Sequence, residues 1–177
     1  MKIWRKRMNH VVLYQPEIPQ NTGNIMRTCV AIGAKLHLIK PLGFSLEEKY
    51  LKRAAANYLE HLDYVVHESI DAFFQSEPGE YYFLSRYGMK SPDAIDVADA
   101  SLTRYFFFGS ESTGIPKAIL KPHIERCFRL PMSVHIRSLN LANTVAIVMY
   151  EVMRQQDYPG LERFEPEIYK GKDHLLK

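Results

Sequence analysis

The fold of this chain is decided by the stretch Tyr105-Phe106-Phe107-Phe108-Gly109-Ser110-Glu111-Ser112-Thr113-Gly114-Ile115-Pro116. Its four consecutive aromatic residues predict a buried β-strand, which ends abruptly in a Gly-x-Glu-x-x-Gly loop. Glycine loops that follow strands in α/β proteins are common ligand sites, because backbone approaches a ligand closely only where Cβ is absent. The stretch therefore predicts an α/β fold with a small-molecule site at the end of this strand.

The glycine spacing of this loop is that of a phosphate-binding loop, but the residues that would hold a phosphate are missing. A Walker loop continues after its second glycine with Lys and then Ser or Thr, whereas Ile115 and Pro116 stand there in this chain. The chain also lacks the dinucleotide-binding fingerprint and the nucleophile elbow of serine hydrolases. Because the Glu111 carboxylate would repel phosphate, we expect the loop to receive a neutral or cationic molecule.

The composition is that of a compact cytoplasmic protein. The chain has 177 residues, of which 46% are hydrophobic and 24% charged. No apolar run approaches the ~20 residues of a membrane span, so no membrane partner is expected. Cys29 and Cys127 are predicted to be reduced core residues, and the seven histidines show no metal-ligand spacing, so no metal is predicted. A net charge of +3 permits a polyanionic partner without requiring one.

The chain divides into three parts by composition. Residues 1–8 are predicted to be a basic, disordered prefix, because Lys2, Arg5, Lys6 and Arg7 precede any patterned segment. Residues 9–160 are predicted to form a single domain, and residues 161–177 a polar C-terminal tail.

Strand-like and helix-like runs alternate along the domain. The predicted strands are His10–Tyr14, Lys35–Ile39, Tyr64–His67, Tyr81–Ser85, Tyr105–Phe108 and Cys127–Leu130. The predicted helices are Gln20–Ile32, a helix capped by Ser45 that runs to about Ala56, Ile70–Gln75, a short helix from Pro116, and Asn140–Gln156. This βαβα order predicts a mostly parallel sheet with helices on both faces.

Two further segments carry polar residues after strands. In the first, residues 16–27, the helical periodicity places Arg27 away from the core and near a helix N-terminus. An ordinary surface arginine, with Asn21 or Thr22 as the helix cap, is an equally simple interpretation of this pattern.

The second segment, residues 130–143, leads into the longest helix, which Ser138 or Asn140 can cap. Capping leaves unexplained why Asn140 and Asn143 interrupt a helix dominated by Leu, Ala, Val, Ile and Met. A helix that is apolar nearly all round must be covered on more than one side, so we expect a second subunit, and hence a homodimer.

Taken in order, three segments resemble the three motifs of the SPOUT, or α/β-knot, methyltransferases. The matching segments are Pro19–Arg27, Phe108–Pro116, and Leu130–Met132 followed by Arg137–Asn143. Within this family the chain is most similar to the tRNA 2'-O-methyltransferases that modify the wobble ribose (the TrmL/YibK group). His135-Ile136 stands where family members often have Pro-Asp, which weakens any role for an aspartate in this loop.

The resemblance implies a C-terminal trefoil knot, a rare feature in proteins. It also implies a cytoplasmic homodimer that uses S-adenosylmethionine to methylate cytidine or uridine 34 of a tRNA, with tRNA(Leu) as the expected substrate. The implied cofactor-binding residues are Leu84, Gly109, Glu111, Ile115, Leu130 and Ser138. The expected catalytic residues are Arg27, Ser138 and Asn140, and the expected tRNA-binding residues include Asn21, Asn24 and Arg27. Lys52 and Arg53 share one face of a predicted helix with Lys49 and form a candidate basic stripe for RNA, although such a stripe is also typical of an ordinary solvated helix face.

Three other functions remain compatible with the sequence. The same fold could methylate ribosomal RNA, or it could bind RNA without chemistry. A flavodoxin-like nucleotide protein would bind FMN or a nucleotide and would be a monomer.

Overall fold

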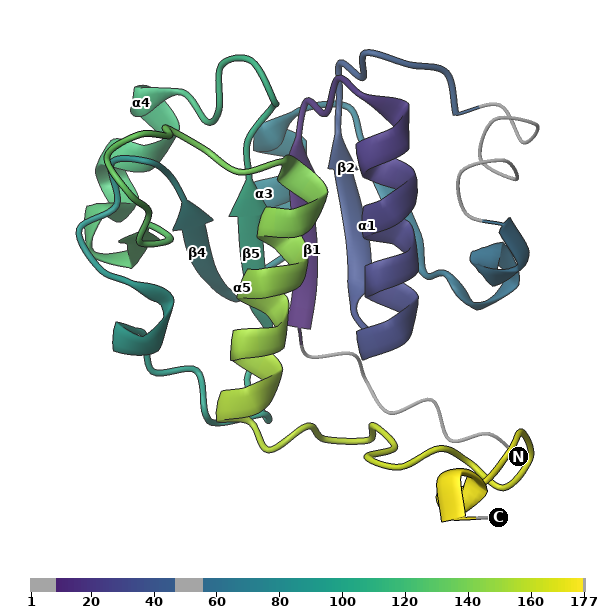
Figure 1. Cartoon of the computed structure of the whole chain (residues 1–177). Coiled ribbons are helices and arrows are strands. Elements are labelled where there is room, and N and C mark those ends of the chain that lie inside the picture. Colours follow the sequence, from purple (N-terminus) through teal and green to yellow (C-terminus); the bar gives the residue numbers. More distant parts are fainter. Residues whose placement is uncertain (1–8, 47–55, 177) are drawn as a thin grey trace.

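The computed structural model describes residues 9–46 and 56–176 of the chain (Figure 1). Its strands are β1 (Asn9–Tyr14), β2 (Lys35–Ile39), β3 (Tyr64–His67), β4 (Glu80–Leu84), β5 (Arg104–Phe108) and β6 (Cys127–Phe128). Its α-helices are α1 (Pro19–Ile32), α3 (Ile70–Ser76), α4 (Lys117–Leu120) and α5 (Leu141–Gln155). Short 3-10 helices cover Ala56–His61, Pro92–Ala94, Lys121–Arg126 and His174–Leu176.

The six strands form one sheet in the order β3-β2-β1-β5-β4-β6, and every strand pair is parallel. All carboxyl ends of the strands therefore meet at the same edge. The chain leaves β1 toward β2 on one side, and β5 pairs with β1 on the other side. Such a reversal of strand order is the point where open parallel sheets bind ligands.

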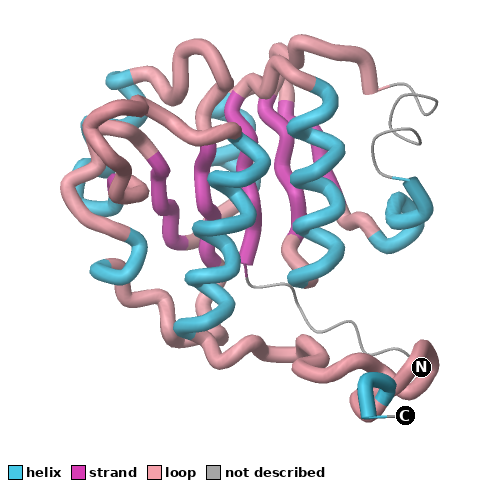
Figure 2. The backbone as a smooth tube through the Cα atoms, viewed as in Figure 1, coloured by secondary structure: helices cyan, strands magenta, loops and turns pink. Residues whose placement is uncertain are grey.

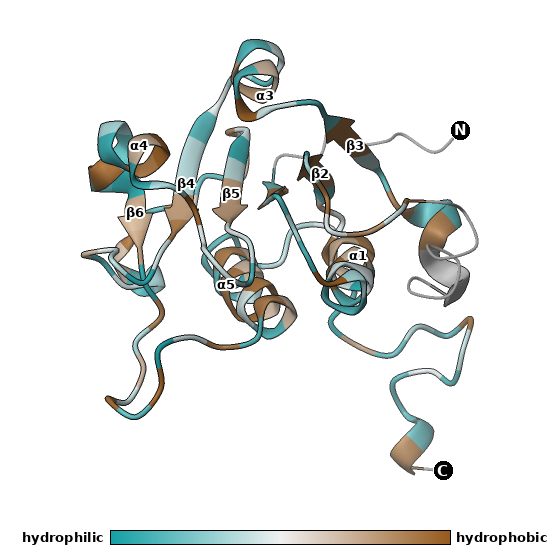
Figure 3. Ribbon diagram, turned by 90° about the horizontal axis from the view of Figure 1, so that it is seen from above, coloured by the Kyte–Doolittle hydropathy of each residue, from teal (hydrophilic) through white to brown (hydrophobic). Residues whose placement is uncertain are grey.

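Helices cover both faces of the sheet, as Figure 3 shows from above. Alternate side chains of a strand point to opposite faces, so Val11 and Phe106 pack toward α1 and α5. Val12 and Phe107 pack toward α3 and α4 on the other face. The predicted parallel α/β sheet with helices on both faces is thus confirmed.

Most element boundaries match the prediction within one residue, and the last strand differs by two. Strand β5 begins at Arg104, one residue early, because this buried side chain pairs with Glu80 at 3.0 Å. The last strand was predicted to reach Leu130 but ends at Phe128. Beyond it the amide of Arg129 donates to the carbonyl of Lys90, outside the sheet. The predicted helix after Ser45 lies largely outside the described residues.

Three histidines form a buried row across one face of the sheet, although they are scattered in the sequence. Nδ1 of His10 lies 2.8 Å from Nε2 of His37, and Nδ1 of His37 lies 2.9 Å from Nε2 of His67. Phe73 of α3 packs edge-on against His37 and His67. Because both ring nitrogens of His37 serve these hydrogen bonds, the row acts as a polar brace between β1, β2 and β3.

The ends of the described chain lie away from the carboxyl edge of the sheet. After α5, residues 161–176 run as an extended, mostly exposed segment past the opposite edge (Figure 2). Within the described residues, no helix combines the length and the apolar character that crossing a bilayer requires.

Candidate active site

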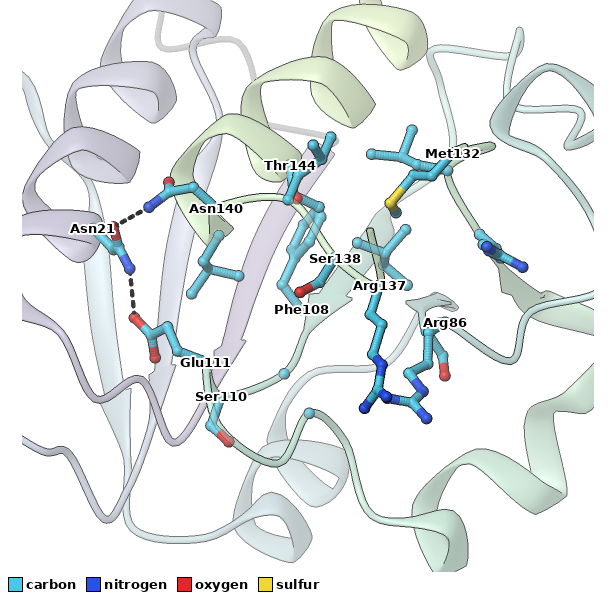
Figure 4. Close-up of a pocket in the computed structure, with 18 of the residues that line it drawn as sticks. Asn21, Arg86, Phe108, Ser110, Glu111, Met132, Arg137, Ser138, Asn140 and Thr144 are labelled. Carbon is cyan, nitrogen blue, oxygen red and sulfur yellow. Dashed lines mark hydrogen bonds between the residues drawn. The ribbon is translucent and has the colours of Figure 1, made fainter. Parts of the chain in front are cut away.

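A cavity of about 400 Å³ opens at the carboxyl edge of the sheet (Figure 4). The loop after β5 and the loop that leads into α5 form most of it, and the ends of β4 and β6 complete it. Its lining residues are Ile18, Asn21, Leu84, Ser85, Arg86, Phe108, Gly109, Ser110, Glu111, Gly114, Arg129, Leu130, Met132, Arg137, Ser138, Leu139, Asn140, Leu141 and Thr144. The three polar segments noted in the sequence therefore meet at one site.

Glu111, in the loop after β5, holds that loop against the segment that precedes α1. Its Oε2 accepts from the backbone N–H of Glu17 at 2.8 Å, and its Oε1 accepts from the backbone N–H of Ile18 at 3.2 Å. In return, the backbone N–H of Ser112 donates to Glu17 Oε2 at 3.1 Å. The Glu111 carboxylate thus accepts from the two backbone amides just before helix α1 and holds the start of the helix in place.

Asn21 and Asn140 extend this hydrogen-bond network to the loop that leads into α5, as Figure 4 shows. Nδ2 of Asn21 donates to Glu111 Oε1 at 2.9 Å, and Nδ2 of Asn140 donates to Oδ1 of Asn21 at 2.9 Å. Asn140 also caps α5, because its Oδ1 accepts from the N–H groups of Ala142 and Asn143. Of the two predicted caps, Asn140 is therefore the one that the structure uses.

Gly109 sets the shape of the loop after β5. A Cβ atom at this position would lie 2.2 Å from the backbone carbon of Gly114, far inside van der Waals contact. The loop therefore closes on itself only because Gly109 has no side chain, and Gly114 turns the chain with a φ of 72°.

The structure brings most of the predicted site residues to the cavity. Those that line it are Asn21, Leu84, Gly109, Glu111, Leu130, Ser138 and Asn140. Ile115 is buried in the core beneath the loop, against Leu120 and Phe107, and is not among the lining residues. The predicted RNA-binding residues Lys52 and Arg53 lie outside the described residues.

Asn24 and Arg27 lie apart from this cavity. Both are exposed on α1, and neither lines the cavity in which Ser138 and Asn140 lie. The prediction that Arg27 projects away from the core is confirmed. Within one protomer, however, the structure separates Arg27 from the other two predicted catalytic residues.

Three arginines in the cavity wall, Arg86, Arg129 and Arg137, were not predicted as site residues. The three arginines lie far apart along the chain, so sequence spacing gave no sign that they line one cavity. A usable signal was their position, since each is one or two residues from Leu84, Leu130 or Ser138, which were predicted to bind the cofactor.

Comparison with known proteins identifies the family. A model of the SpoU rRNA Methylase family matches residues 8–150. A Bacillus subtilis protein, provisionally named a tRNA (cytidine(34)-2'-O)-methyltransferase, is 48% identical over 86% of this chain and 96% of its own length. A Methylovorus glucosotrophus protein with the same name, unqualified, is 44% identical over 86% of this chain and 99% of its own length.

A solved structure supports the same assignment. It was described for 2-OH methylation of C/U34 on tRNA, is 41% identical and superposes with a TM-score of 0.77. The match covers 85% of this chain and 97% of the other. Both the extent of the family match and the identity to full-length relatives confirm the resemblance seen in the sequence. The chain belongs to the SpoU methylase family.

Proposed function

We propose that this protein transfers a methyl group from S-adenosylmethionine to the ribose 2'-hydroxyl of the wobble nucleotide, cytidine or uridine 34, of a tRNA. The observation that carries the proposal is the convergence of the three predicted motifs on one cavity. Relatives at 44% and 48% identity over nearly their full length carry the name of this activity.

The cavity suits S-adenosylmethionine in size and in the chemistry of its walls. Its volume of about 400 Å³ is in the range of small-molecule sites. Leu84 and Leu130 offer apolar surface for the adenine base, and Gly109 has no side chain that would cover the backbone beside it. When bound, S-adenosylmethionine supplies an electrophilic methyl group on a positively charged sulfur.

The residues of the chain would act mainly by positioning. Asn21, Glu111 and Asn140 hold the three loops in register through the hydrogen bonds described above. Ser138, two residues before the capped N-terminus of α5, would orient cofactor and acceptor. Holding the reacting atoms in line supplies a large part of the rate of such a transfer.

Arg27 would engage a backbone phosphate of the RNA or the reacting hydroxyl itself. Its guanidinium stays protonated in proteins, so it does not serve as the general base. Its exposed position on α1 places it on the outer face of the helix layer, where it is available to a second copy of the chain.

We also propose a homodimer that forms through this outer face. On α5, Ile147 and Tyr150 are 48% and 47% exposed although they belong to a largely apolar helix. A second copy would cover them and bring Asn24 and Arg27 of one protomer toward the other. Sizing of the wild type against Ile147→Glu tests this, since a buried carboxylate should break the dimer. A wild type that elutes as a monomer contradicts it.

The trefoil knot, the cytoplasmic location and the preference for tRNA(Leu) belong to the same proposal. In support of the knot, β6 lies at the sheet edge beyond β4, so the chain must return across the ends of β4 and β5 to reach α5. Location and isoacceptor follow from the resemblance to the wobble-ribose methyltransferases.

The decisive experiment is incubation of the protein and labelled S-adenosylmethionine with bulk tRNA and, separately, with ribosomal RNA, followed by nucleoside mapping. Label at position 34 supports the proposal, whereas label only in ribosomal RNA supports the related activity on that substrate. RNA binding without transfer indicates a non-catalytic module. Arg27→Ala should abolish transfer and leave cofactor affinity unchanged; persistent activity contradicts the role of Arg27.

A further inference from the structure

Three arginines are among the residues that line the cavity: Arg86, Arg129 and Arg137, called here the arginine cluster. All three side chains are exposed to solvent. Figure 4 shows Arg86 and Arg137 extending into the same part of the cavity. They come from the end of β4 and the loop before α5, while Arg129 directly follows β6. Three distant segments thus contribute an arginine each to the lining of one cavity.

Within the described residues, no carboxylate is paired with the arginine cluster. Other arginines of the chain do have such partners: Arg104 and Arg126 pair with Glu80, Arg154 with Glu151, and Arg163 with Asp157.

Among the described residues, the carboxylate that lines the cavity, Glu111, makes no ion pair with the arginine cluster. Glu111 is already bound by Asn21 and by the backbone amides of Glu17 and Ile18. Like charges that line one cavity without an ion-pair partner repel one another, and an anion that binds among them relieves this repulsion.

S-adenosylmethionine does not supply enough negative charge to match this cluster. Its ammonium and sulfonium groups outnumber its carboxylate, so the molecule carries a net positive charge. An RNA strand, by contrast, brings one full negative charge with each phosphate. The guanidinium fork matches phosphate oxygens with two parallel hydrogen bonds, which makes arginine a preferred phosphate ligand.

We propose that the arginine cluster binds a backbone phosphate of the tRNA next to the nucleotide that is methylated. This inference rests on the proposed function, and it adds a substrate-positioning site on the same protomer as the cofactor cavity. Arg137 immediately precedes Ser138, and Arg129 immediately precedes Leu130. A phosphate held by the cluster therefore lies beside the cofactor pocket, as methylation of the adjacent ribose requires.

A second hollow continues from the cluster and suits the next part of the strand. It has a volume of about 270 Å³, and it shares Arg129 and Met132 with the main cavity. Its other lining residues are Gly88, Met89, Lys90, Ser91 and Pro131. Arg129 therefore stands between the two depressions, where a single strand that enters one can extend into the other.

The test compares Arg86→Gln, Arg129→Gln and Arg137→Gln with the matched control Arg163→Gln. Arg163 is also exposed but pairs with Asp157 beyond the far end of α5. For each protein, tRNA affinity is measured over a series of salt concentrations, and S-adenosylmethionine affinity by calorimetry. Arg137→Lys, which keeps the charge but loses the fork, shows whether two-point binding matters.

We expect the Gln variants to bind tRNA about tenfold to a hundredfold more weakly, the effect of losing a charge-assisted hydrogen bond. The slope of log affinity against log salt should become shallower by about 0.7 for each phosphate that the variant no longer neutralises. Cofactor affinity should stay within about twofold of the wild type, as in the control. Arg137→Lys should lie between the wild type and Arg137→Gln.

The proposal is overturned if tRNA affinity and salt slope match those of Arg163→Gln. It is also overturned if cofactor affinity falls as far as tRNA affinity, since the bound anion is then the cofactor carboxylate. Failure of the proposed function looks different. If the wild-type protein methylates no tRNA, the proposed activity is refuted. If the Gln variants nevertheless bind RNA more weakly than the wild type, the arginine cluster still stands as an RNA-binding site.

Discussion

Nδ2 of Asn140 donates a hydrogen bond to Oδ1 of Asn21 at 2.9 Å and so joins two residues that are 119 positions apart in the chain. Asn21 lies in the first turn of α1, and Asn140 caps α5. Because Asn21 also donates to Glu111, this one contact makes the three loops a single hydrogen-bonded unit.

Asn140→Asp separates the two tasks of this side chain. The aspartate still accepts from the N–H groups of Ala142 and Asn143, and its charge favours a helix N-terminus. It cannot donate to Asn21. We expect a thermal midpoint within a few degrees of the wild type but at least tenfold weaker cofactor binding, measured by calorimetry.

The control for this change is Asn143→Asp, the same substitution three residues later at an exposed position. The cofactor affinity of Asn143→Asp should equal that of the wild type. Equal cofactor affinity in Asn140→Asp and in this control would show that the Asn21–Asn140 contact does not shape the cavity.

Glu111→Gln should destabilise the protein and weaken cofactor binding. The carboxylate accepts from three donors, and a glutamine side chain turns one acceptor into an NH₂ group that faces N–H donors. We expect a loss of about 1–3 kcal/mol in the free energy of unfolding, measured by urea denaturation. A stability equal to that of the wild type would contradict the locking role of Glu111.

Gly109→Ala and Gly114→Ala form a matched pair of substitutions in one loop. The first places Cβ against the backbone of Gly114, so the loop must open and the cavity must change shape. The second meets nothing within 4 Å and strains only a backbone with positive φ, at a cost of about 1 kcal/mol. Calorimetry should find cofactor binding lost in Gly109→Ala and kept in Gly114→Ala; the reverse order would refute this account.

The histidine row should make the protein sensitive to acid. Burial, followed by the influence of His10 and Lys35, lowers the pKa of His37 from 6.5 to about 2. Burial also lowers the pKa of His67. The unfolded state therefore binds protons more readily, so the stability contributed by these residues is complete above pH 6.5 and is lost as the pH falls below it.

Denaturation in urea between pH 6.5 and pH 4.5 measures this effect, with the range set by the ordinary histidine pKa. Through His37 alone, the free energy of unfolding should fall by about 1.4 kcal/mol for each unit by which the pH is lowered in this range. His37→Phe should be less stable at pH 7 but should show a shallower pH dependence. His135→Phe, at an exposed histidine, should keep the wild-type slope, and equal slopes in both variants would exclude the row as the cause.

The sequence predicted those parts of the fold that depend on local pattern. The strands Lys35–Ile39 and Tyr64–His67 match at both ends, because each is a short apolar run. Helix α5 was predicted within one residue, since its cap and its periodicity are both local signals. Most of the predicted site residues also line the cavity, because the motifs that carry them are contiguous in the chain.

The parts that were missed depend on strand order and register, which spacing along a chain does not determine. His10, His37 and His67 meet only because β1, β2 and β3 are neighbours with a particular register. The arginine cluster likewise joins residues from three segments, each of which looks like ordinary surface charge on its own. Arg104 looked like a loop residue before β5, because its partner Glu80 is 24 positions away.

The buried state of both cysteines has a practical consequence. Cys29 and Cys127 are free thiols inside the core, so gentle alkylating dyes should react slowly with them. A single cysteine introduced at Leu175, which is 94% exposed, would then take up a fluorophore selectively. The C-terminal segment that carries this residue runs past the edge of the sheet opposite to the cavity (Figure 2). Such a labelled protein would report tRNA encounter by anisotropy without blocking the entrance that the RNA must use.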